Sequence, residues 1–473
     1  MLDKNVTRFL SSIPTEKSVR NNVCNIIYIF IIAREASALN SSLAAVSARS
    51  QERLLRKEDH MKTLYHKINR RFKKIVQRFV PHNTRYRPSG VCKINAEGIF
   101  STNSSELIVH PVYENELTRL DIPDALFEAC SDYWKPKREV LTDYIIAEIP
   151  SGRVYTDNES SVAIVTKYNR VVENVSLSLV DGKVVEPNLN NIFEQRYFSI
   201  PKRVKGTVFT LLTGGAGLNN ISHWFLDVLP RLHLLKESGL YDRVDYFLVP
   251  SLRYDYQRET LELLGIPAEK IITSDTCPHL AADCIIASTA PRGNHTLVPV
   301  WLCDFIQNAF SNAIPEGELP GLYPSRIYIS RKDSKMRNVI NEIQLEKELK
   351  AQGFETIVSS QLSIKEKIKI FSQAEVVVSA TGAGLINMLF CKPGTRLIEI
   401  FNEGFVIEPF YDIAPKIGLD YDYIICEGIR PITNASQGQR EDVLVDIERL
   451  LQLLKKDTAK DKRQSVVGAA YTD

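Results

Sequence analysis

The sequence has no long hydrophobic run, no closely paired cysteines and no large excess of charge of either sign. Its longest apolar run near the N-terminus is IIYIFIIA at Ile26–Ala33, whereas about 20 residues are needed to cross the ~30 Å core of a bilayer. The 8 cysteines are scattered without a CxxC pair, which is typical of free thiols in a reducing compartment. These absences predict a cytoplasmic protein without a transmembrane helix or a disulfide framework.

Charge is distributed unevenly although the net charge is only +2. Residues 49–78 carry 11 Lys/Arg and 3 Asp/Glu, a local charge of +8, which leaves −6 for the rest of the chain. Apolar residues recur in the same segment at steps of three and four, which predicts an amphipathic helix. One interpretation is a helix packed on the body of the protein or in a homo-oligomer interface. The other is peripheral contact of residues 49–80 with anionic lipid on the inner membrane face. We predict no nucleic-acid partner.

The 473 residues are too many for one compact core, so two or three domains are expected. Short β-branched segments dominate from about residue 95 to 200, and strand-like and helix-like segments alternate twice from about residue 205. This alternation predicts an α/β fold with two doubly wound, Rossmann-like parallel sheets. The expected parts are a helical basic extension (1–90), a β-rich segment with the first Rossmann-like domain (91–315), the second Rossmann-like domain (316–456) and a disordered tail (457–473).

One glycine turn, TGAGLIN at Thr381–Asn387, follows the strand-like segment VVVSA. Gly382 and Gly384 allow a close backbone approach that a Cβ would block, and the start of the following helix offers free N–H groups to an anion. Arg331 and Arg337 leave an earlier strand of the same set, and Arg can bind two phosphate oxygens at once. The turn and loop therefore predict a diphosphate site. The alternatives are a plain tight turn and a solvated charged loop.

A second glycine turn, GGAGLNN at 214–220, has no basic loop nearby. His223 and Asp227 follow it at a spacing of four, which places both on one face of a helix. A carboxylate beside an imidazole fixes its tautomer and prepares it for general-base work. Taken alone, a His next to a Trp is more often a packed structural residue. The neighbouring groups that we expect to bind a neutral polyol are Asn219, Asn220 and Trp224.

These segments resemble glycosyltransferase family 61. The stretch NNISHWFLDVLPRL at 219–232 is similar to the family signature N-x-x-H-W-x-x-D-x-L-P-R-L. RNVINE at 337–342 and GAGLINMLFCKPGTRLIEI at 382–400 are similar to its R-x-x-x-N-E and G-A-G-L-x-N-x-x-F-x-x-P-G-x-x-x-I-E blocks. The resemblance covers roughly residues 140–430, and the motifs occur in the family's order.

The resemblance implies a GT-B fold, in which two Rossmann-like domains face a cleft. It also implies an inverting transfer, without a metal or other cofactor, from a nucleotide sugar, uridine-linked or similar, to a glycan acceptor in capsular, exopolysaccharide or cell-surface glycan synthesis. His223 would be the base, supported by Asp227. The implied donor-binding residues are Arg331, Arg337, Glu342, Thr381, Gly382, Ala383, Gly384, Asn387 and Glu399. For Glu342 and Glu399 a structural role stays an alternative to binding ribose or sugar hydroxyls.

One position departs from the family pattern, because Thr381 stands where the family commonly has His before GAGL. If that His contacts phosphate or polarises the leaving group, Thr381 offers only a hydroxyl in its place, so donor affinity or donor choice is expected to differ. The departure also supports an alternative from another class, a non-catalytic carbohydrate-binding or scaffold component of a polysaccharide assembly complex. A dehydrogenase or methyltransferase is poorly supported, because neither turn is followed by an acidic ribose ligand about 20 residues later.

Overall fold

The computed structural model describes residues 83–94, 105–130, 132–180, 183–293, 295–311, 323–428 and 435–455. The chain divides into two compact units, residues 1–82 and 83–473, and everything described belongs to the second. The predicted helix with its lipid or oligomer contact at 49–80, and the predicted tail at 457–473, lie outside the described residues. In the described ranges, no helix is long and apolar enough to cross a membrane, and the seven cysteines are free.

A first sheet contains a parallel core in the order β11-β10-β9-β12. The strands are β9 (Lys202–Thr210), β10 (Tyr246–Val249), β11 (Ile271–Thr273) and β12 (His279–Ser288). In chain order this is 3-2-1-4, so the direction of winding reverses between β9 and β12. Ligands of open α/β sheets bind at such a reversal, outside the carboxyl ends of the strands.

Further strands, most of them antiparallel, continue the same sheet beyond β12, which pairs with both β3 and β4. The exception is β1, which pairs parallel with β6. These further strands correspond to the β-rich segment that the sequence predicts, although they extend the sheet rather than form a separate subdomain. Their bounds are β1 (Gly90–Cys92), β2 (Ile108–Arg119), β3 (Glu139–Pro150), β4 (Arg153–Thr156), β5 (Ser161–Val165), β6 (Arg170–Val172), β7 (Leu177–Val180) and β8 (Lys183–Val184).

Among the described residues, helices pack against one face of the first sheet, whereas the sequence predicts a doubly wound arrangement there. Phe209 and Ile286 pack on the helical face against α7 (Arg231–Glu237), α8 (Asp255–Leu263) and α9 (Val300–Ser311). On the opposite face, Val208 and Ile285 pack against residues of the antiparallel strands. The long strands β2 and β3 supply Val109, Ile145 and Ile149 to that core. In the described ranges, strands therefore cover the face that helices were expected to cover.

The second sheet is entirely parallel, in the order β14-β13-β15-β16-β17. Chain order is 2-1-3-4-5, so the winding reverses between β13 and β15. The helix α10 packs with one face, and α11, η9 and α12 pack with the other, so this sheet is doubly wound as predicted. The bounds are β13 (Arg326–Ile329), α10 (Glu342–Ala351), β14 (Glu355–Ile357), α11 (Ile364–Ser372), β15 (Val376–Ala380), η9 (Ala383–Phe390), β16 (Arg396–Asn402), α12 (Phe410–Lys416) and β17 (Asp420–Cys426).

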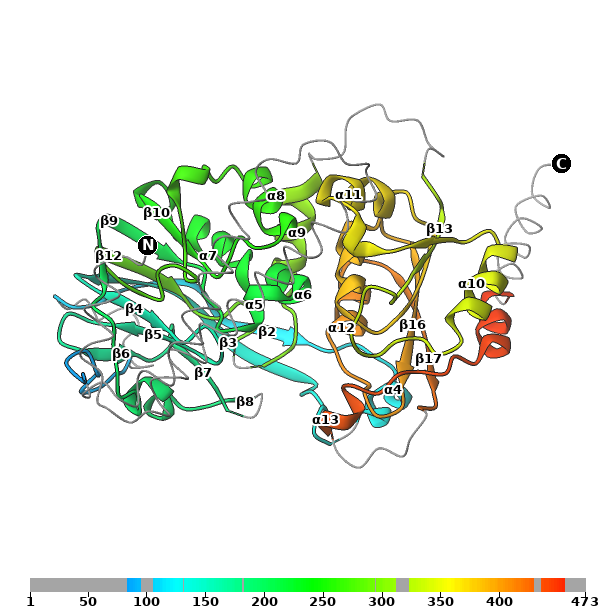
Figure 1. Ribbon diagram of the computed structural model, residues 1–473, viewed down its shortest axis with the longest axis horizontal. Coiled ribbons are helices and arrows are strands. Elements are labelled where there is room, and N and C mark those ends of the chain that lie inside the picture. The colour runs from blue at the N-terminus through cyan, green and yellow to red at the C-terminus, as the bar shows by residue number, and fades with distance from the viewer. Residues whose placement is uncertain are drawn as a thin grey trace, which may run out of the picture. The chain divides into compact units, whose positions relative to one another are not determined.

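One continuous apolar core joins the helices of the first sheet to those of the second (Figure 1). Phe225 and Phe390, one from each side, have ring centroids 5.7 Å apart. A second connection runs from the β2–β3 strands through α4 (Asp124–Ala129), whose Leu126 packs with Phe401 and Tyr411 of the second sheet. The remaining short helices are η3 (Pro187–Leu189), η4 (Asn191–Phe193), η6 (Tyr241–Arg243), η7 (Ala268–Lys270), η8 (Ser359–Gln361) and α13 (Ala435–Gly438).

Candidate functional site

His223 and Asp227 lie on the chain that follows β9, at the winding reversal of the first sheet. The segment is not one regular α-helix. It begins with α6 (Ile221–His223) and continues as a single π-helical stretch, η5 (Trp224–Val228), in which the Leu229 amide donates to the Trp224 carbonyl at 3.0 Å. Isolated π-helical turns are rare and occur frequently at functional sites. Steps of three and four in the sequence do not reveal such a turn.

The predicted contact between His223 and Asp227 is present, with His223 Nδ1 2.6 Å from Asp227 Oδ2. Arg292, in the loop after β12, holds the same carboxylate with Nε at 2.8 Å and Nη2 at 2.9 Å. Burial favours the protonated acid, but Arg292 and His223 overcome it and hold the pKa of Asp227 well below its ordinary value. The carboxylate is therefore ionised and can only accept hydrogen bonds.

This arrangement fixes which nitrogen of His223 carries a proton. Because ionised Asp227 accepts at 2.6 Å, Nδ1 must be the donor, and a neutral imidazole then has its lone pair on Nε2. The side chain is 37% exposed, so solvent and solutes can reach it. His223 can accordingly take a proton from a hydroxyl while Asp227 stabilises the imidazolium that forms.

Arg231 and Arg292 support this cluster, and neither is among the site residues predicted from the sequence. Buried Arg231 donates from Nε to the Asp227 carbonyl at 3.0 Å and from Nη1 to the Ser288 carbonyl at 2.9 Å, which ties the π-helical stretch to the end of β12. Arg292 could have been found by the argument used for Arg331. It is also a cation leaving the carboxyl end of a strand, after CIIASTAP.

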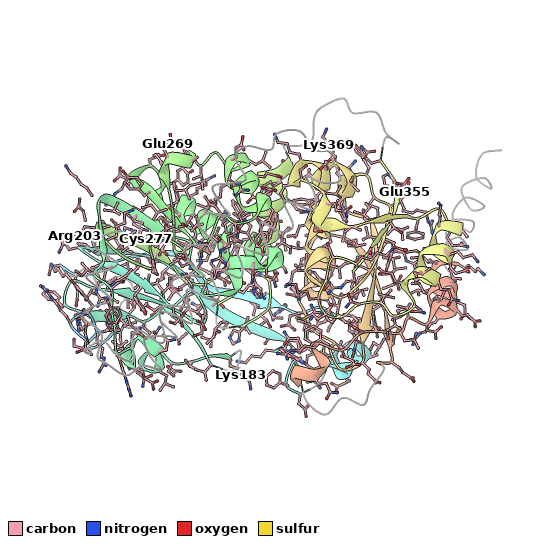
Figure 2. All side chains as sticks on the ribbon, viewed as in Figure 1. Lys183, Arg203, Glu269, Cys277, Glu355 and Lys369 are labelled. Atoms are coloured by element: carbon pink, nitrogen blue, oxygen red, sulfur yellow. The ribbon has the colours of Figure 1, made fainter. Side chains whose placement is uncertain are left out.

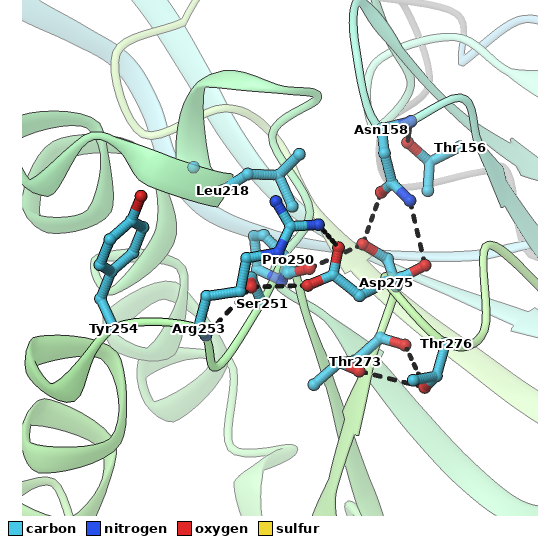
Figure 3. A network of polar contacts seen from close by, with 12 residues as sticks. Thr156, Asn158, Leu218, Pro250, Ser251, Arg253, Tyr254, Thr273, Asp275 and Thr276 are labelled. Atoms are coloured by element: carbon cyan, nitrogen blue, oxygen red, sulfur yellow. Dashed lines mark hydrogen bonds and ion pairs between the residues drawn. The ribbon is translucent and has the colours of Figure 1, made fainter. Parts of the chain in front are cut away.

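In the first glycine turn, backbone packing requires the glycine at Gly215. A Cβ on Gly215 would come within 2.5 Å of the Glu159 carbonyl oxygen, and the Gly215 amide already donates to that oxygen at 3.0 Å. The turn thus seats on the loop after β4, and Asn158 of that loop donates to the Ser274 carbonyl at 3.0 Å. Figure 3 shows Asn158 together with the neighbouring Ser251–Asp275 hydrogen bond of 2.6 Å.

The three residues expected to bind a polyol do not share one surface. Trp224 is fully buried and donates from its indole nitrogen to Thr260 Oγ1 at 2.9 Å, so it is a core residue with no surface toward an acceptor. Asn220 caps α6 by accepting from the Ser222 amide at 2.9 Å. Asn219 is exposed at the end of α5 (Ala216–Asn219).

Arg331 and Gly382 lie at the winding reversal of the second sheet, after β13 and β15 respectively. A Cβ on Gly382 would fall 1.7 Å from Arg331 Nη1, so the glycine is required for the guanidinium to lie against the turn. The same guanidinium donates from Nη2 to Ser334 Oγ and to the Met336 carbonyl, both at 2.8 Å. The predicted proximity of the basic loop and the glycine turn is therefore present.

Arg337 is the second guanidinium at this edge. It has a positive φ of 55°, which is uncommon for a residue other than glycine. Its Nη1 donates to the Gln439 carbonyl at 2.7 Å, and its guanidinium carbon lies 4.9 Å from the Phe405 ring centroid. Burial, reinforced by repulsion from Arg331, lowers the pKa of Arg337 to about 10. Among the described residues neither guanidinium forms an ion pair, although the carboxylates of Asp333, Glu342 and Asp442 act on Arg331 from a greater distance. An anion would thus find two guanidiniums without a paired carboxylate here.

Glu342 and Asn387 support this edge from beneath. Glu342 Oε1 accepts from the Tyr328 hydroxyl at 3.0 Å, the Ser330 hydroxyl at 2.8 Å and the Arg331 amide at 3.1 Å. Asn387 Nδ2 donates to Ser359 Oγ at 3.0 Å and to the Gly384 carbonyl at 2.8 Å. Both side chains are buried. For Glu342, these contacts correspond to the structural role that was the alternative to binding ribose or sugar hydroxyls. Donor binding by Glu342 or Asn387 stays a prediction.

Glu399, on β16 next to β15, is fully buried. Burial raises the pKa of Glu399 to about 8, against the opposing effect of the Thr381 and Tyr421 hydroxyls. The Tyr421 hydroxyl donates to Oε2 at 2.9 Å, whereas Oε1 has no partner in hydrogen-bond geometry among the described residues. Thr381 is itself 3% exposed, so its hydroxyl faces the protein interior rather than solvent.

The elements that carry the two edges are neighbours, since α6 lies directly against η9. His223 is the last residue of α6, and η9 begins with Ala383 of the second glycine turn. His223 thus lies on an element that adjoins the glycine turn against which the Arg331 guanidinium packs. Such an arrangement can deprotonate a hydroxyl on one side and stabilise an anionic leaving group on the other.

Comparison with protein families gives one match: the family model described as Glycosyltransferase 61 matches residues 221–398. The matched segment begins at the first residue of α6 and contains His223, Asp227, Arg292, Arg331 and the second glycine turn. No curated protein matches this chain. The match confirms the resemblance to this family for residues 221–398 and supports glycosyltransferase activity at the family level.

Proposed function

We propose that this chain is an inverting glycosyltransferase of GT-B type that needs no metal. The proposal is supported by the match of residues 221–398 to Glycosyltransferase 61 and by the two winding reversals. The enzyme transfers a sugar from a nucleotide-sugar donor, uridine-linked or similar, to a hydroxyl of a glycan acceptor. The process is the synthesis of a capsular, exopolysaccharide or other cell-surface glycan. The observation that carries this proposal is the contact of α6 with η9, which joins a prepared base to a cationic edge.

In the proposed reaction, His223 Nε2 accepts the proton of the acceptor hydroxyl as the oxygen of that hydroxyl attacks the anomeric carbon. The bond between that carbon and the diphosphate oxygen breaks on the opposite face, so the configuration inverts. Asp227 stabilises the imidazolium, and Arg292 keeps the carboxylate ionised and in place. Arg331 and Arg337 receive the negative charge of the departing nucleoside diphosphate through charge-assisted hydrogen bonds.

The roles are tested by separating nucleotide binding from turnover. His223→Ala should reduce transfer by about 10²–10⁴-fold, the usual contribution of a general base, while thermal stabilisation by the nucleotide is retained. Arg337→Ala should weaken that stabilisation. His110→Ala on β2 and Arg119→Ala, whose partner Glu139 is on the exposed surface, are matched controls that should change neither readout.

A screen of nucleotide sugars by thermal shift and by donor hydrolysis provides the decisive outcome. Stabilisation by a nucleoside diphosphate that is lost in Arg337→Ala supports the enzyme. No stabilisation of the wild-type chain by any nucleotide would instead favour the non-catalytic scaffold, which Thr381 in place of the family's histidine motivates.

A further inference from the structure

A cavity of about 630 Å³ lies on the antiparallel side of the first sheet, among β4, β9 and β12. It shares no residue with the two edges described above. Arg203, in its lining, is at the end of the first sheet far from Glu355 and Lys369, which mark the second sheet (Figure 2). The lining is formed by Arg85, Tyr86, Ser151, Arg153, Thr166, Lys167, Asn169, Pro201, Arg203, Val204, Lys205, Ala281, Ala282 and Asp283.

Strand register explains why this region is hollow and basic. Ala281 of β12 is paired with Arg153 of β4 on one side and with Arg203 of β9 on the other. Residues opposite one another on paired strands share a face, and two strand spacings separate the arginine backbones by roughly 10 Å. The small side chain of Ala281 leaves the space between the two long cationic side chains unfilled.

Arg153 is buried and has no anionic partner in the part of the chain that the structure describes. There its guanidinium contacts three neutral acceptors: His279 Nε2 at 3.1 Å, the Tyr86 carbonyl and Asn169 Oδ1. His279 is neutral at pH 7, because burial lowers its pKa to about 4. Burial likewise lowers the pKa of Arg153 to about 10, which still leaves the guanidinium charged. A buried cation of this kind is costly unless an anion pairs with it.

The rest of the lining is of the same sign. Arg85, Lys167, Arg203 and Lys205 add four cations, and Asp283 is the one carboxylate in the lining. Asp283 already accepts from the Gly206 amide at 2.8 Å. None of the lining cations has an ion pair among the described residues, so the cavity has a net charge of about +4 with donors on several sides.

We infer that this cavity binds a phosphoryl group, either as free phosphate or on a small phosphorylated saccharide. A dianionic tetrahedral group offers oxygens in several directions, which suits arginines and lysines that come from β4, β9 and the loops containing Arg85 and Lys167. The volume exceeds what one phosphate needs, so a sugar ring beside the phosphoryl group can be accommodated next to Tyr86 and Pro201.

The test is calorimetric titration of the full chain carrying Arg337→Ala, which weakens the phosphate affinity expected at the proposed donor edge. Inorganic phosphate, glucose 6-phosphate and glucose are the titrants. Phosphate and glucose 6-phosphate should bind and glucose should not. Equal affinities would identify the phosphoryl group alone as the ligand, and tighter binding of glucose 6-phosphate would identify a phosphorylated saccharide.

Arg203→Gln/Lys205→Gln should then weaken phosphate binding at least about tenfold, because two charge-assisted contacts are lost. Both residues are exposed, so the fold should tolerate the change. Lys202→Gln/Lys183→Gln removes the same charge from exposed positions of the same sheet outside the cavity and should leave affinity unchanged. Absence of phosphate binding, or equal weakening by both pairs, would overturn the inference. Neither result bears on nucleotide-sugar transfer, which is measured separately.

Discussion

The two winding reversals of this protein handle charge in opposite ways. At the first, the Asp227 carboxylate is matched by the guanidinium of Arg292 in a two-point contact. At the second, Arg331 and Arg337 have no carboxylate paired with them among the described residues. The buried acid of that edge, Glu399, has no cationic partner among the residues that the structure describes. Positive and negative groups are thus paired at one edge and kept apart at the other.

This difference indicates what each edge still needs. The first edge is electrostatically complete, so its role is to hold one imidazole in one orientation and one tautomer. The second edge is incomplete, because two desolvated guanidiniums repel one another until an anion lies between or beside them. A charged ligand therefore belongs at the second edge and an uncharged one at the first, which is the division that a nucleotide-sugar donor and a glycan acceptor require.

The most damaging way to break the comparison is Asp227→Ala, which unpairs the first edge. The Arg292 side chain, 12% exposed, would be left as a buried cation without a counterion, at a cost of about 3–5 kcal/mol. Denaturant unfolding should show this loss. Asp124→Ala, which breaks the exposed pair with Arg138, is the matched control and should cost at most about 1 kcal/mol. Equal losses in the two variants would contradict a paired, buried first edge.

Glu399→Gln probes the unpaired acid of the second edge through pH. The pKa of Glu399 is raised from 4.5 to about 8, so between these values the folded protein holds a proton that the unfolded chain has released. Stability should therefore fall as pH rises from 4.5 to 8, by at most about 1.4 kcal/mol per unit from this group, and level off above pH 8.

The variant should lose this slope and gain stability relative to the wild type as pH approaches 8. Unfolding midpoints measured at several pH values provide the test. Glu355→Gln, an exposed position on the edge strand β14 of the same sheet, should keep the wild-type slope. If wild type and Glu399→Gln lose stability in parallel across this range, Glu399 is already paired in the folded protein.

Gly382→Ala is expected to disturb the cationic edge without removing a charge. The backbone of Gly382 is extended, with φ of 166°, so alanine is acceptable there except for its collision with Arg331. Displacing that guanidinium should weaken nucleotide binding by about 1.5–3 kcal/mol, the range for a hydrogen bond to a charged group. The Cβ of Gly384→Ala would meet Ile329 Cγ2 at 3.3 Å and Ser359 Cβ at 3.8 Å, so this variant should weaken binding less. Nucleotide titrations that rank the two variants in the reverse order would refute this packing explanation.

The second edge was the more predictable of the two from sequence. The glycine turn, the strand before it and the basic loop are all local patterns, and the parallel-sheet rule brings their ends together. Arg292 was missed because its partner is 65 positions away in the chain. The pairing depends on β9 and β12 being neighbours, which strand order decides and local pattern does not.

The first glycine turn shows where local pattern misleads. GGAGLNN resembles TGAGLIN closely, and the sequence predicted a ligand-binding site at both turns. In the structure, a Cβ at Gly215 would lie 2.5 Å from the Glu159 carbonyl oxygen, whereas a Cβ at Gly382 would collide with the Arg331 guanidinium. The same residue type thus serves backbone packing at one edge and side-chain placement at the other, and only long-range contacts distinguish the two uses.

The smallest effect separates two roles of neighbouring asparagines at the first edge. Asn220 caps α6, so Asn220→Ala should cost about 1 kcal/mol of stability and leave the KM for the acceptor nearly unchanged. Asn219 is exposed and does not cap this helix, so Asn219→Ala should leave stability unchanged, and any rise in acceptor KM should come from this variant. A rise in KM confined to Asn220→Ala would mean that the cap also contacts the acceptor. The first edge would then bind its uncharged ligand with the same residues that position His223.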